Sequence, residues 1–302
     1  DRAAALVELG WYASPLHAFA VQAEPQYYSA SRKGSSLTSA EARLGSAWPA
    51  VGMTSEVAVG GVWRETGTEW TGRGELGLRL PLHLLARLKA ERAPYLWTVA
   101  SLETPVMTET GTALLTWSDP RGWSGEAAAS VQRYADGNRV RSSYAWFLAP
   151  VIRAPSGGVE IGYGVSVQDA DQLRYALPTR SSDGTLIPAR FDPYFTPIAT
   201  QAHSLTAAAG WKGGRAALRA GGAYGFYARE DAPFAIVGSP QPGLVTRSFH
   251  PWNLRARLDV PLSRGVTATA GTELFATAFY TYRALDLGLF VRFLGSAARE
   301  PR

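Results

Sequence analysis

The sequence predicts an all-β chain that forms an antiparallel, up-and-down transmembrane β-barrel of about 16 strands, within a range of roughly 14 to 18. Three observations predict this fold class. Apolar and polar residues alternate with a period of two along most of the chain, and no helical periodicity is sustained. Turn signals separate the alternating segments. The segments run for about 10 to 15 residues, whereas soluble strands typically have about 5 or 6 and tilted membrane strands need about 9 to 11.

Composition narrows the function classes. The 302 residues include no cysteine, which excludes disulfide frameworks, thiol nucleophiles and thiolate metal sites. No uncharged apolar run approaches the roughly 20 residues of a membrane-spanning helix. The net charge of +5 comes from arginines that are spread along the chain rather than clustered, so we expect no nucleic-acid partner. We also expect no metal site and no cofactor, because the chain has no metal-ligand cluster or nucleotide fingerprint.

The segments follow one another along the chain with short turns between them. Turn signals stand at "DPRG" (119 to 122), "ADGN" (135 to 138), "PSGG" (155 to 158), "KGG" (212 to 214) and "SRG" (263 to 265). The clearest strands are predicted at 138–150, 158–168, 215–229, 248–262 and 266–278. The count is least secure between Trp48 and Thr108, where "WPAVG", "PLH", "RAPY" and "TPV" are each a turn or an interruption.

Tryptophan positions favour lipid over a protein core on the apolar face. Trp63 and Trp70 flank one proposed turn, Trp117 and Trp123 flank another, and Trp211 lies at the edge of a third. Membrane barrels gather aromatic residues at both interfaces, whereas a sandwich buries tryptophan in mid-strand. A soluble antiparallel barrel or propeller remains the alternative.

The connections are unequal in length. Residues 169–200 and 230–247 are long and polar or rich in Pro and Gly, and both fall on the same side of the strand count. Long loops on one face and short turns on the other are typical of outer-membrane barrels, whose long loops face the outside of the cell. If the pore does not conduct, the segment 169–200 is the expected plug.

The stretch "ALDLGLFVRF" (284 to 293) carries the first family resemblance. Asp286, Gly288, Val291 and Phe293 resemble the carboxy-terminal sorting signal of bacterial outer-membrane β-barrels, which are porin-like proteins of Gram-negative bacteria. The resemblance implies an outer-membrane location, contact with outer-membrane lipid and lipopolysaccharide, and recognition by the barrel assembly machinery. It also implies that residues 1–293 form the barrel and that 294–302 are a C-terminal extension or an expression remnant.

A second resemblance concerns the transported molecule. "ERAPYLWTVASLETPV" (91 to 106) and "TWSDPRGWSGEA" (116 to 127) are similar to the barrel domains of exopolysaccharide secretion porins. That resemblance implies a channel that passes a polysaccharide out of the cell, with a periplasmic helical-repeat scaffold as partner. The alternative is a general or substrate-selective diffusion porin for small anionic or sugar solutes.

A barrel of this size encloses an aqueous channel, so its inward residues set its selectivity. The alternation predicts this pore lining: Glu41, Arg43, Arg64, Arg73, Glu75, Arg79, Arg87, Glu126, Arg139, Arg141, Glu160, Arg215, Arg219, Arg255, Arg257 and Glu273. Arginine exceeds carboxylate on the predicted inner face, which favours anions mildly. The competing interpretation is a lateral lattice of Arg–carboxylate pairs that stiffens the wall. Tyr12, Tyr28, Tyr134 and Phe147 are candidates for stacking sugar rings in the lumen.

An enzyme is not expected, and a barrel hydrolase is the least favoured reading. Such a hydrolase needs a Ser/His or Asp/His constellation at one end of the barrel, and only His17, His83, His203 and His250 are available. His203 is followed by Ser204, but neighbours in a strand point to opposite faces and cannot form a dyad directly.

Overall fold

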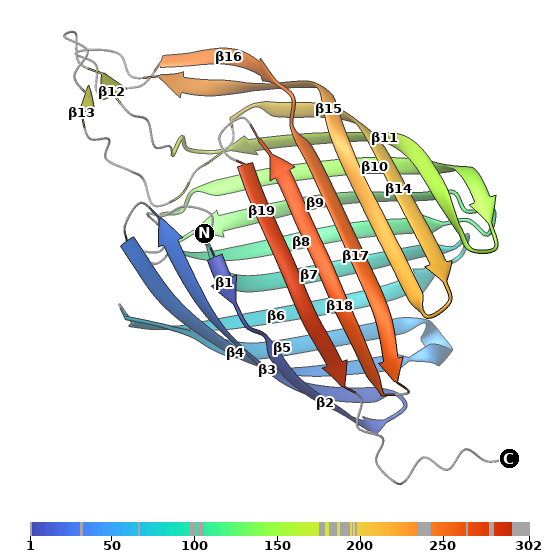
Figure 1. Cartoon of the computed structure of the whole chain (residues 1–302). Coiled ribbons are helices and arrows are strands. Elements are labelled where there is room, and N and C mark those ends of the chain that lie inside the picture. Colours follow the sequence, from blue (N-terminus) through green and yellow to red (C-terminus); the bar gives the residue numbers. More distant parts are fainter. Residues whose placement is uncertain are drawn as a thin grey trace, which may run out of the picture.

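The structure is a computed structural model, and almost every residue that it describes lies in a β-strand or a tight turn (Figure 1). It describes residues 2–30, 33–65, 67–96, 101, 106–174, 179–180, 186–187, 194, 196, 198–234, 243–263, 265–277 and 281–291. No helix within these ranges has the length and apolarity to cross a membrane.

The strands succeed one another from the N-terminus to the C-terminus with one short 3-10 helix, η1 (Pro49–Val51), between β4 and β5. Their bounds are β1 (Arg2–Ala4), β2 (Val7–Ser14), β3 (His17–Ala30), β4 (Lys33–Trp48), β5 (Met53–Arg64), β6 (Gly67–Leu80), β7 (Leu84–Pro94), β8 (Met107–Ser118), β9 (Ser124–Tyr134), β10 (Arg139–Ala154), β11 (Gly157–Ala170), β12 (Thr179–Arg180), β13 (Leu186–Ile187), β14 (Thr200–Gly213), β15 (Ala216–Phe234), β16 (Gly243–Phe249), β17 (Trp252–Ser263), β18 (Val266–Ala276) and β19 (Thr281–Val291).

All of these segments except β12 and β13 form one antiparallel sheet of seventeen segments. Sixteen strands remain when β1 and β2 are counted as one, because they pair with successive stretches of β3. β16 and β17 likewise pair with successive stretches of β15, so β16 extends β17 beyond the end of the barrel wall, and the wall itself has fifteen strands among the described residues. The predicted antiparallel fold class with about sixteen strands is confirmed.

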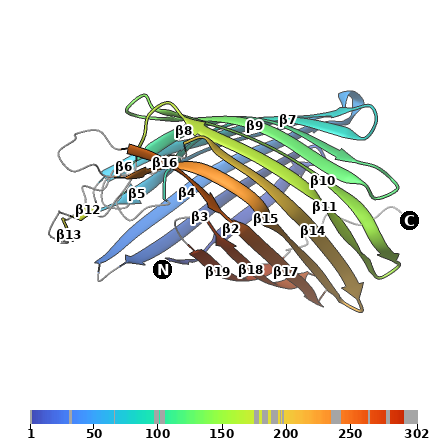
Figure 2. The same ribbon diagram turned by 90° about the horizontal axis from the view of Figure 1, so that it is seen from above.

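The sheet curls so that β14, β15 and β17–β19 lie opposite β5–β10, as both views show (Figures 1 and 2). When β1 and β2 are counted as one strand, β16 and β17 as another, and the separate β12–β13 pair is set aside, every ladder joins strands that are neighbours in the chain. Among the described strands, β2 pairs only with β3, and β19 pairs only with β18. These two edge strands run in the same direction, because both begin at the same end of the sheet.

The connections divide between the two ends of the strands as predicted. One end, which we call the turn end, carries the connections 15–16, 49–52, 81–83, 119–123, 155–156, 214–215 and 264–265. The other end, the loop end, carries the three long connections 95–106, 171–199 and 235–242 together with the short ones 31–32, 65–66, 135–138 and 277–280. The segments "WPAVG" and "PLH" are both turns. At "ADGN", Gly137 has φ 85°, a left-handed conformation that glycine adopts without strain.

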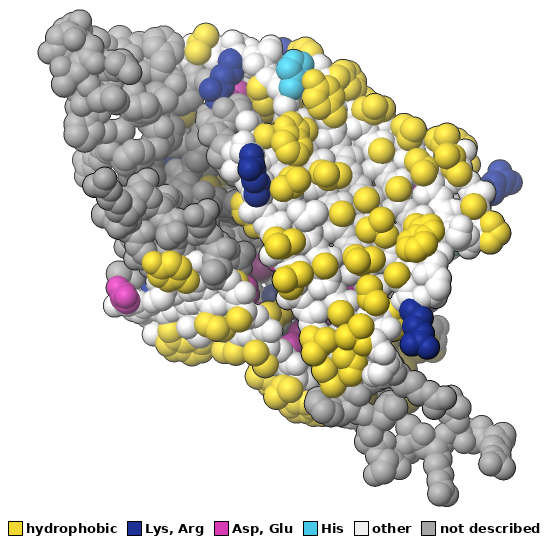
Figure 3. Space-filling model, in the orientation of Figure 1, with side chains coloured by type: hydrophobic (Ala, Val, Ile, Leu, Met, Phe, Trp, Pro, Cys, Tyr) yellow, Lys and Arg dark blue, Asp and Glu magenta, His cyan; other side chains and the backbone are white. Residues whose placement is uncertain are grey.

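The outer face of the sheet is apolar (Figure 3). Leu285, Leu287 and Leu289 on β19 are 73%, 78% and 63% exposed, and this row continues onto β17 and β18 through the ladders. Exposed leucine in mid-strand costs free energy in water, whereas it costs none against hydrocarbon. The oily row of the last strand therefore faces lipid rather than a protein core.

Tryptophan lies near both ends of this apolar face. On β5, Trp63 stands at the loop end and Met53 at the turn end, where Met53 pairs with Trp48. All three residues share the outer register, as do Trp70, Trp117 and Trp211. The ten residue steps from Met53 to Trp63 span about 33 Å along the strand, or about 25 Å in height at the tilt of a membrane barrel. That height matches the apolar band of outer-membrane barrels.

Candidate pore lining

The ladders decide which side chains face the lumen. Arg43 on β4 is level with Ala58 on β5, which is level with Arg73 on β6. Cross-strand partners share a face, so these residues and the ones two positions away form the inner register. The opposite register is the apolar outer face, and the charged register therefore lines the concave inside.

Arginines and carboxylates form a lattice on the inner wall of β2–β6. Arg43 Nη2 lies 2.9 Å from Glu8 Oε1, and Arg43 Nε lies 4.0 Å from Glu56. Arg73 Nη2 donates hydrogen bonds to Glu41 at 3.1 Å and to Glu56 at 2.8 Å. Each arginine thus bridges carboxylates from two other strands, which ties neighbouring strands together laterally.

Further ion pairs continue around the inner wall. Arg87 and Glu75 approach to 3.8 Å, and Lys89 and Glu91 to 2.5 Å. Across the barrel, Arg255 pairs with Glu273 at 2.5 Å and Arg257 with Asp259 at 2.8 Å. Arg255 and Arg257 keep 74% and 63% of their side-chain surface exposed, so they face open space in the lumen.

The structure places most of the predicted pore-lining residues on the inner register: Glu41, Arg43, Arg64, Arg73, Glu75, Arg79, Arg87, Glu126, Glu160, Arg219, Arg255, Arg257 and Glu273. Glu8 belongs to the same lattice and is an inner-register residue beyond the predicted set. It stands four residues before Tyr12 in the same period-two register, so the alternation alone could have identified it.

Three arginines and one aromatic residue do not lie where they were predicted. Arg139 and Arg141 lie on the outer register of β10, because Val140 and Ser142 pair with the inward Gln132 and Ser130. Arg215 lies in the turn between β14 and β15, and Phe147 packs outside the wall against Trp117 and Trp123.

The physical reason for these errors is that β10 is apolar on both registers. Tyr144 and Trp146 alternate with Ala145 and Phe147, so the segment's own pattern does not decide its orientation. The ladder with β9 decides it instead. With Arg139, Arg141 and Arg215 removed, the described inner register carries the cations Arg43, Arg64, Arg73, Arg79, Arg87, Lys89, Arg153, Lys212, Arg219, Arg255 and Arg257 and the carboxylates Glu8, Glu24, Glu41, Glu56, Glu69, Glu75, Glu91, Glu126, Glu160, Asp259, Glu273 and Asp286, so cations do not exceed carboxylates in the lumen. The expected anion preference therefore loses its basis.

Small hydroxyl side chains cover the inner wall between the charged regions. Thr112, Ser130 and Ser142 follow one another across β8, β9 and β10, and Ser130 Oγ and Ser142 Oγ are 2.7 Å apart. A hollow of about 840 Å³ borders this part of the wall. Nearby, Glu126 accepts hydrogen bonds from Thr116 at 3.2 Å and from Tyr144 at 2.8 Å. The row Thr112–Ser130–Ser142 offers hydrogen-bonding groups on small side chains, and the bulky Tyr144 and Trp146 follow Ser142 on the same face of β10.

At the loop end, the long connection 171–199 is fastened to the β9–β10 turn. Asn138 is fully buried, and its side chain both donates to the Gln172 carbonyl at 3.0 Å and accepts from the Gln172 N–H at 2.9 Å. Arg174 donates to Asp136 at 2.7 Å through Nη2 and at 3.1 Å through Nε. These contacts fix the start of the connection to the rim of the pore.

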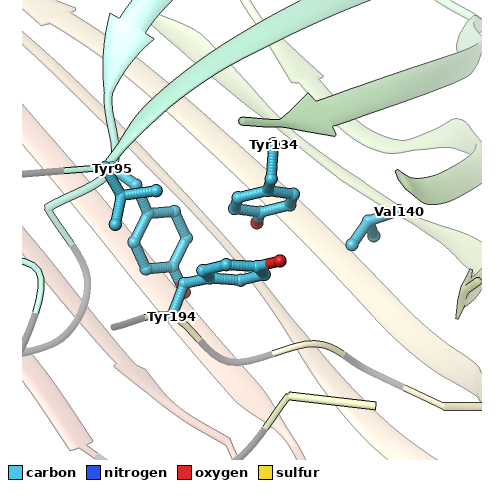
Figure 4. Close-up of a cluster of buried hydrophobic side chains, with 5 residues drawn as sticks. Tyr95, Tyr134, Val140 and Tyr194 are labelled. Atoms are coloured by element: carbon cyan, nitrogen blue, oxygen red, sulfur yellow. The ribbon is translucent and has the colours of Figure 1, made fainter. Parts of the chain in front are cut away.

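Tyr194 fixes the same connection near its other end. Its ring stacks on Tyr134 with 3.8 Å between centroids, and Tyr95 contacts both rings edge-on (Figure 4). Tyr134 and Val140 belong to the inner register, so Tyr194 reaches inside the mouth of the barrel. The rest of the predicted plug lies largely outside the described residues.

Asp136 is the electrostatic centre of this clamp. Burial acts to raise its pKa, but hydrogen bonds from Tyr194 Oη at 2.6 Å, the Asn138 N–H at 3.1 Å and Arg174 outweigh burial and hold the pKa below its usual range. Burial raises the pKa of Tyr194, which therefore stays protonated and donates to the carboxylate.

His203 and Ser204 do not form a dyad. His203 lies on the outer register of β14, where it contacts the Tyr163 hydroxyl and Gln201, whereas Ser204 lies on the inner register. The predicted sorting signal is on β19, with Val291 on the outer register and Asp286 and Gly288 on the inner one. Phe293 and the predicted extension 294–302 lie outside the described residues.

No protein-family model matches the chain, and no curated protein matches its sequence. Solved structures do match its fold. A "bacterial polysaccharide outer membrane secretin" superposes with a TM-score of 0.61 and 9% identity, over 95% of this chain and 91% of that chain. The fold is that of a bacterial outer-membrane β-barrel.

Two other outer-membrane barrels match less closely. The siderophore receptor PirA from Pseudomonas aeruginosa has a TM-score of 0.34 and 10% identity, over 97% of this chain and 71% of that chain. The translocator domain of the autotransporter NalP from Neisseria meningitidis has a TM-score of 0.27 and 9% identity, over 97% of this chain and 87% of that chain.

Proposed function

We propose that the barrel is an outer-membrane secretion channel that passes a polysaccharide or a similar hydrophilic polymer out of the cell. The observation that carries the proposal is the inner wall, where Thr112, Ser130 and Ser142 form a track of small hydroxyl groups beside the hollow. Hydroxyl groups exchange hydrogen bonds with sugars, and their small size leaves room for a chain to slide. Similarity in fold to a polysaccharide secretin supports the same direction.

The charged lattice suits a channel for a neutral or weakly charged polymer. Paired arginines and carboxylates keep the wall rigid and hydrated while they present little net charge to the polymer. The partners that this function requires are the polymer itself and a periplasmic delivery element, for which a helical-repeat scaffold is the candidate.

Two adjacent serines on β10 provide a direct test. Ser142 faces the lumen and Ser143 faces outward, so Ser142→Trp narrows the track while Ser143→Trp adds an aromatic side chain on the lipid side. We expect Ser142→Trp to lower single-channel conductance in planar bilayers and polymer release from cells, and Ser143→Trp to change neither. Equal effects of the two substitutions would count against a lumenal track.

The anchored loop favours a second candidate, an uptake porin for small sugars. A loop that reaches inside the mouth, as Tyr194 does, is expected of diffusion porins. The two candidates differ in cells. Deletion of a secretion channel leaves polymer in the periplasm, whereas deletion of an uptake porin slows growth on a limiting sugar. A neighbouring gene for a polysaccharide synthase would favour secretion.

A further inference from the structure

Positive charge gathers at the turn end of the barrel. Arg121 and Arg215 lie in the turns 119–123 and 214–215. Arg79, Arg153 and Lys212 are each the next-to-last residue of a strand that leads into a turn at this end, namely β6, β10 and β14. All five residues are exposed, and Figure 3 shows cationic side chains at the tips of the β10–β11 and β14–β15 turns. We call these five residues the basic collar.

Contacts between turns make most of the collar a continuous arc. The guanidinium group of Arg153 lies against Gly122, which follows Arg121 in the β8–β9 turn, so these two cations are neighbours. The Lys212 N–H donates a hydrogen bond to the Ser156 carbonyl in the β10–β11 turn at 2.6 Å. That bond joins the β14–β15 turn to the arc.

A β-bulge in β10 brings Arg153 to the inner register. Before the bulge, odd-numbered residues of β10 such as Arg141 face outward, and the register shifts between Pro150 and Ile152. Beyond the shift, Arg153 is level with Gly158, which belongs to the inner register of β11. Bulges re-aim side chains in this way, and this one turns a cation towards the mouth of the pore.

Two other members of the collar share the inner register. Arg79 follows Glu75 on the inner face of β6, and Lys212 is level with the inward Ala217 on β15. The collar therefore borders the pore entrance at the turn end rather than the lipid-facing surface.

The described residues at the turn end offer the collar almost no counter-charge. Asp119 is the single carboxylate among the described turn residues of that end, and its Oδ1 accepts a hydrogen bond from the Arg121 N–H of the same turn at 2.6 Å. No described carboxylate forms an ion pair with any of the five cations. At the loop end, in contrast, Arg92, Arg141 and Arg174 each pair with a carboxylate. Unpaired cations at a pore entrance raise the local concentration of anions.

We propose that the basic collar captures the leading segment of a polysaccharide that carries carboxylate groups, such as those of uronic acids, along a largely neutral chain. The inference rests on the proposed secretion function, and the turn end faces the periplasm in barrels of this class. Guanidinium groups bind carboxylates through paired, charge-assisted hydrogen bonds. Over the whole inner wall carboxylates balance the cations, so the collar sets where the polymer binds first without making the pore anion-selective.

The test counts blockades of single full-length barrels in planar bilayers by oligogalacturonate, a carboxylate-bearing sugar oligomer, added to one chamber. Because the chain has no cysteine, Ala50→Cys in the turn 49–52 accepts a single biotin label. Streptavidin added after each recording then shows which chamber the turn end faces.

We expect Arg153→Gln/Lys212→Gln to lower the association rate from the turn-end side at least about fivefold at low salt, because clustered charge accelerates capture by roughly 10- to 1,000-fold. The wild-type rate should fall in the same way when KCl is raised from about 0.1 M to about 1 M, which shortens the reach of the charges from about 10 Å to about 3 Å. The matched control is Arg133→Gln/Arg139→Gln, which removes two arginines from the outer register at the loop end and should leave the rate unchanged.

Three results would overturn the capture site. They are equal association rates in the collar and control variants, equal rates from the two sides of the wild-type barrel, and equal rates for the fully methyl-esterified, neutral oligomer. Loss of polymer release from cells by the collar variant, with a normal association rate, would assign the collar to docking of an acidic periplasmic protein and would also overturn capture. The single variants Arg153→Gln and Lys212→Gln give the same readout if the double variant does not fold.

The proposed function is judged separately by Ser142→Trp. That variant should lower conductance and polymer release whether or not the collar binds oligogalacturonate. A normal Ser142→Trp barrel therefore counts against the secretion track, whereas an unchanged association rate in the collar variant counts against the collar alone.

Discussion

Substitutions at two consecutive residues on β18 test which face of the sheet contacts lipid. Ala270 lies on the outer register between Leu258 and Leu287, and Thr269 lies on the inner register between Asp259 and Gly288. Ala270 is four residues from Val266 at the turn end, about 14 Å along the strand and about 10 Å in height at a typical tilt. It therefore stands close to the middle of an apolar band about 25 Å tall.

An arginine at Ala270 must place its guanidinium near the centre of the hydrocarbon. The expected loss for Ala270→Arg is about 2–4 kcal/mol, or roughly 30- to 1,000-fold in the folding equilibrium. Thr269→Arg enters water beside Asp259, where an exposed ion pair changes stability by less than about 1 kcal/mol. Reversible urea unfolding in phospholipid vesicles, followed by tryptophan fluorescence, measures both. Equal losses, or a larger loss for Thr269→Arg, would refute the assignment of the faces.

Three other predictions concern the lattice, the clamp and the lumen. Arg73→Ala should destabilise the barrel by about 1–3 kcal/mol in the same unfolding assay, because it strips two carboxylates of a charge-assisted partner, and a loss no greater than that of Arg79→Ala would contradict the lattice. Asp136→Asn should speed protease cleavage within 171–199 at neutral pH. Because folding lowers the pKa of Asp136, its contribution is present at neutral pH and is lost as the pH falls from the usual carboxyl pKa of about 3.9 through the lower pKa of the folded state. At a pH below that lower value, pepsin should cut the wild-type and variant loops equally fast. In a KCl gradient the reversal potential should show no anion preference, and clear anion selectivity would mean that the corrected register misplaces the arginines.

The fold could be predicted from the sequence because each membrane strand carries an alternating pattern within its own residues. On β11, Val159, Ile161 and Tyr163 alternate with polar or glycine residues, and the turns at 135–138 and 155–156 follow from Asp-Gly and Ser-Gly signals. A period of two, read one strand at a time, is sufficient for this purpose. Pairing between arginines and carboxylates along the wall was also foreseeable from the sequence. The particular pairing of Arg73 with two glutamates was not.

The features that the sequence did not predict depend on how residues in different segments pair with one another. The orientation of β10 is fixed by its register with β9 rather than by its own residues, which is why Arg139 and Arg141 were misplaced. The clamp was missed for a similar reason. Asp136 and Tyr194 are 58 residues apart, and nothing in either local segment shows that the two meet.

The neighbour-to-neighbour order of the ladders has a consequence for how the chain reaches this shape. Most strands can add to the growing sheet as hairpins, because only a few residues must be closed into a loop at each step. The longest loop to close is the step from β11 to β14, which spans residues 171–199. Asn138 and Asp136 hold the start of that span on a hairpin that is already complete, which shortens the free chain that must close. The backbone edges of β2 and β19 are then the last to remain without a strand partner. Closure of the sheet is therefore the only assembly step that involves both ends of the chain.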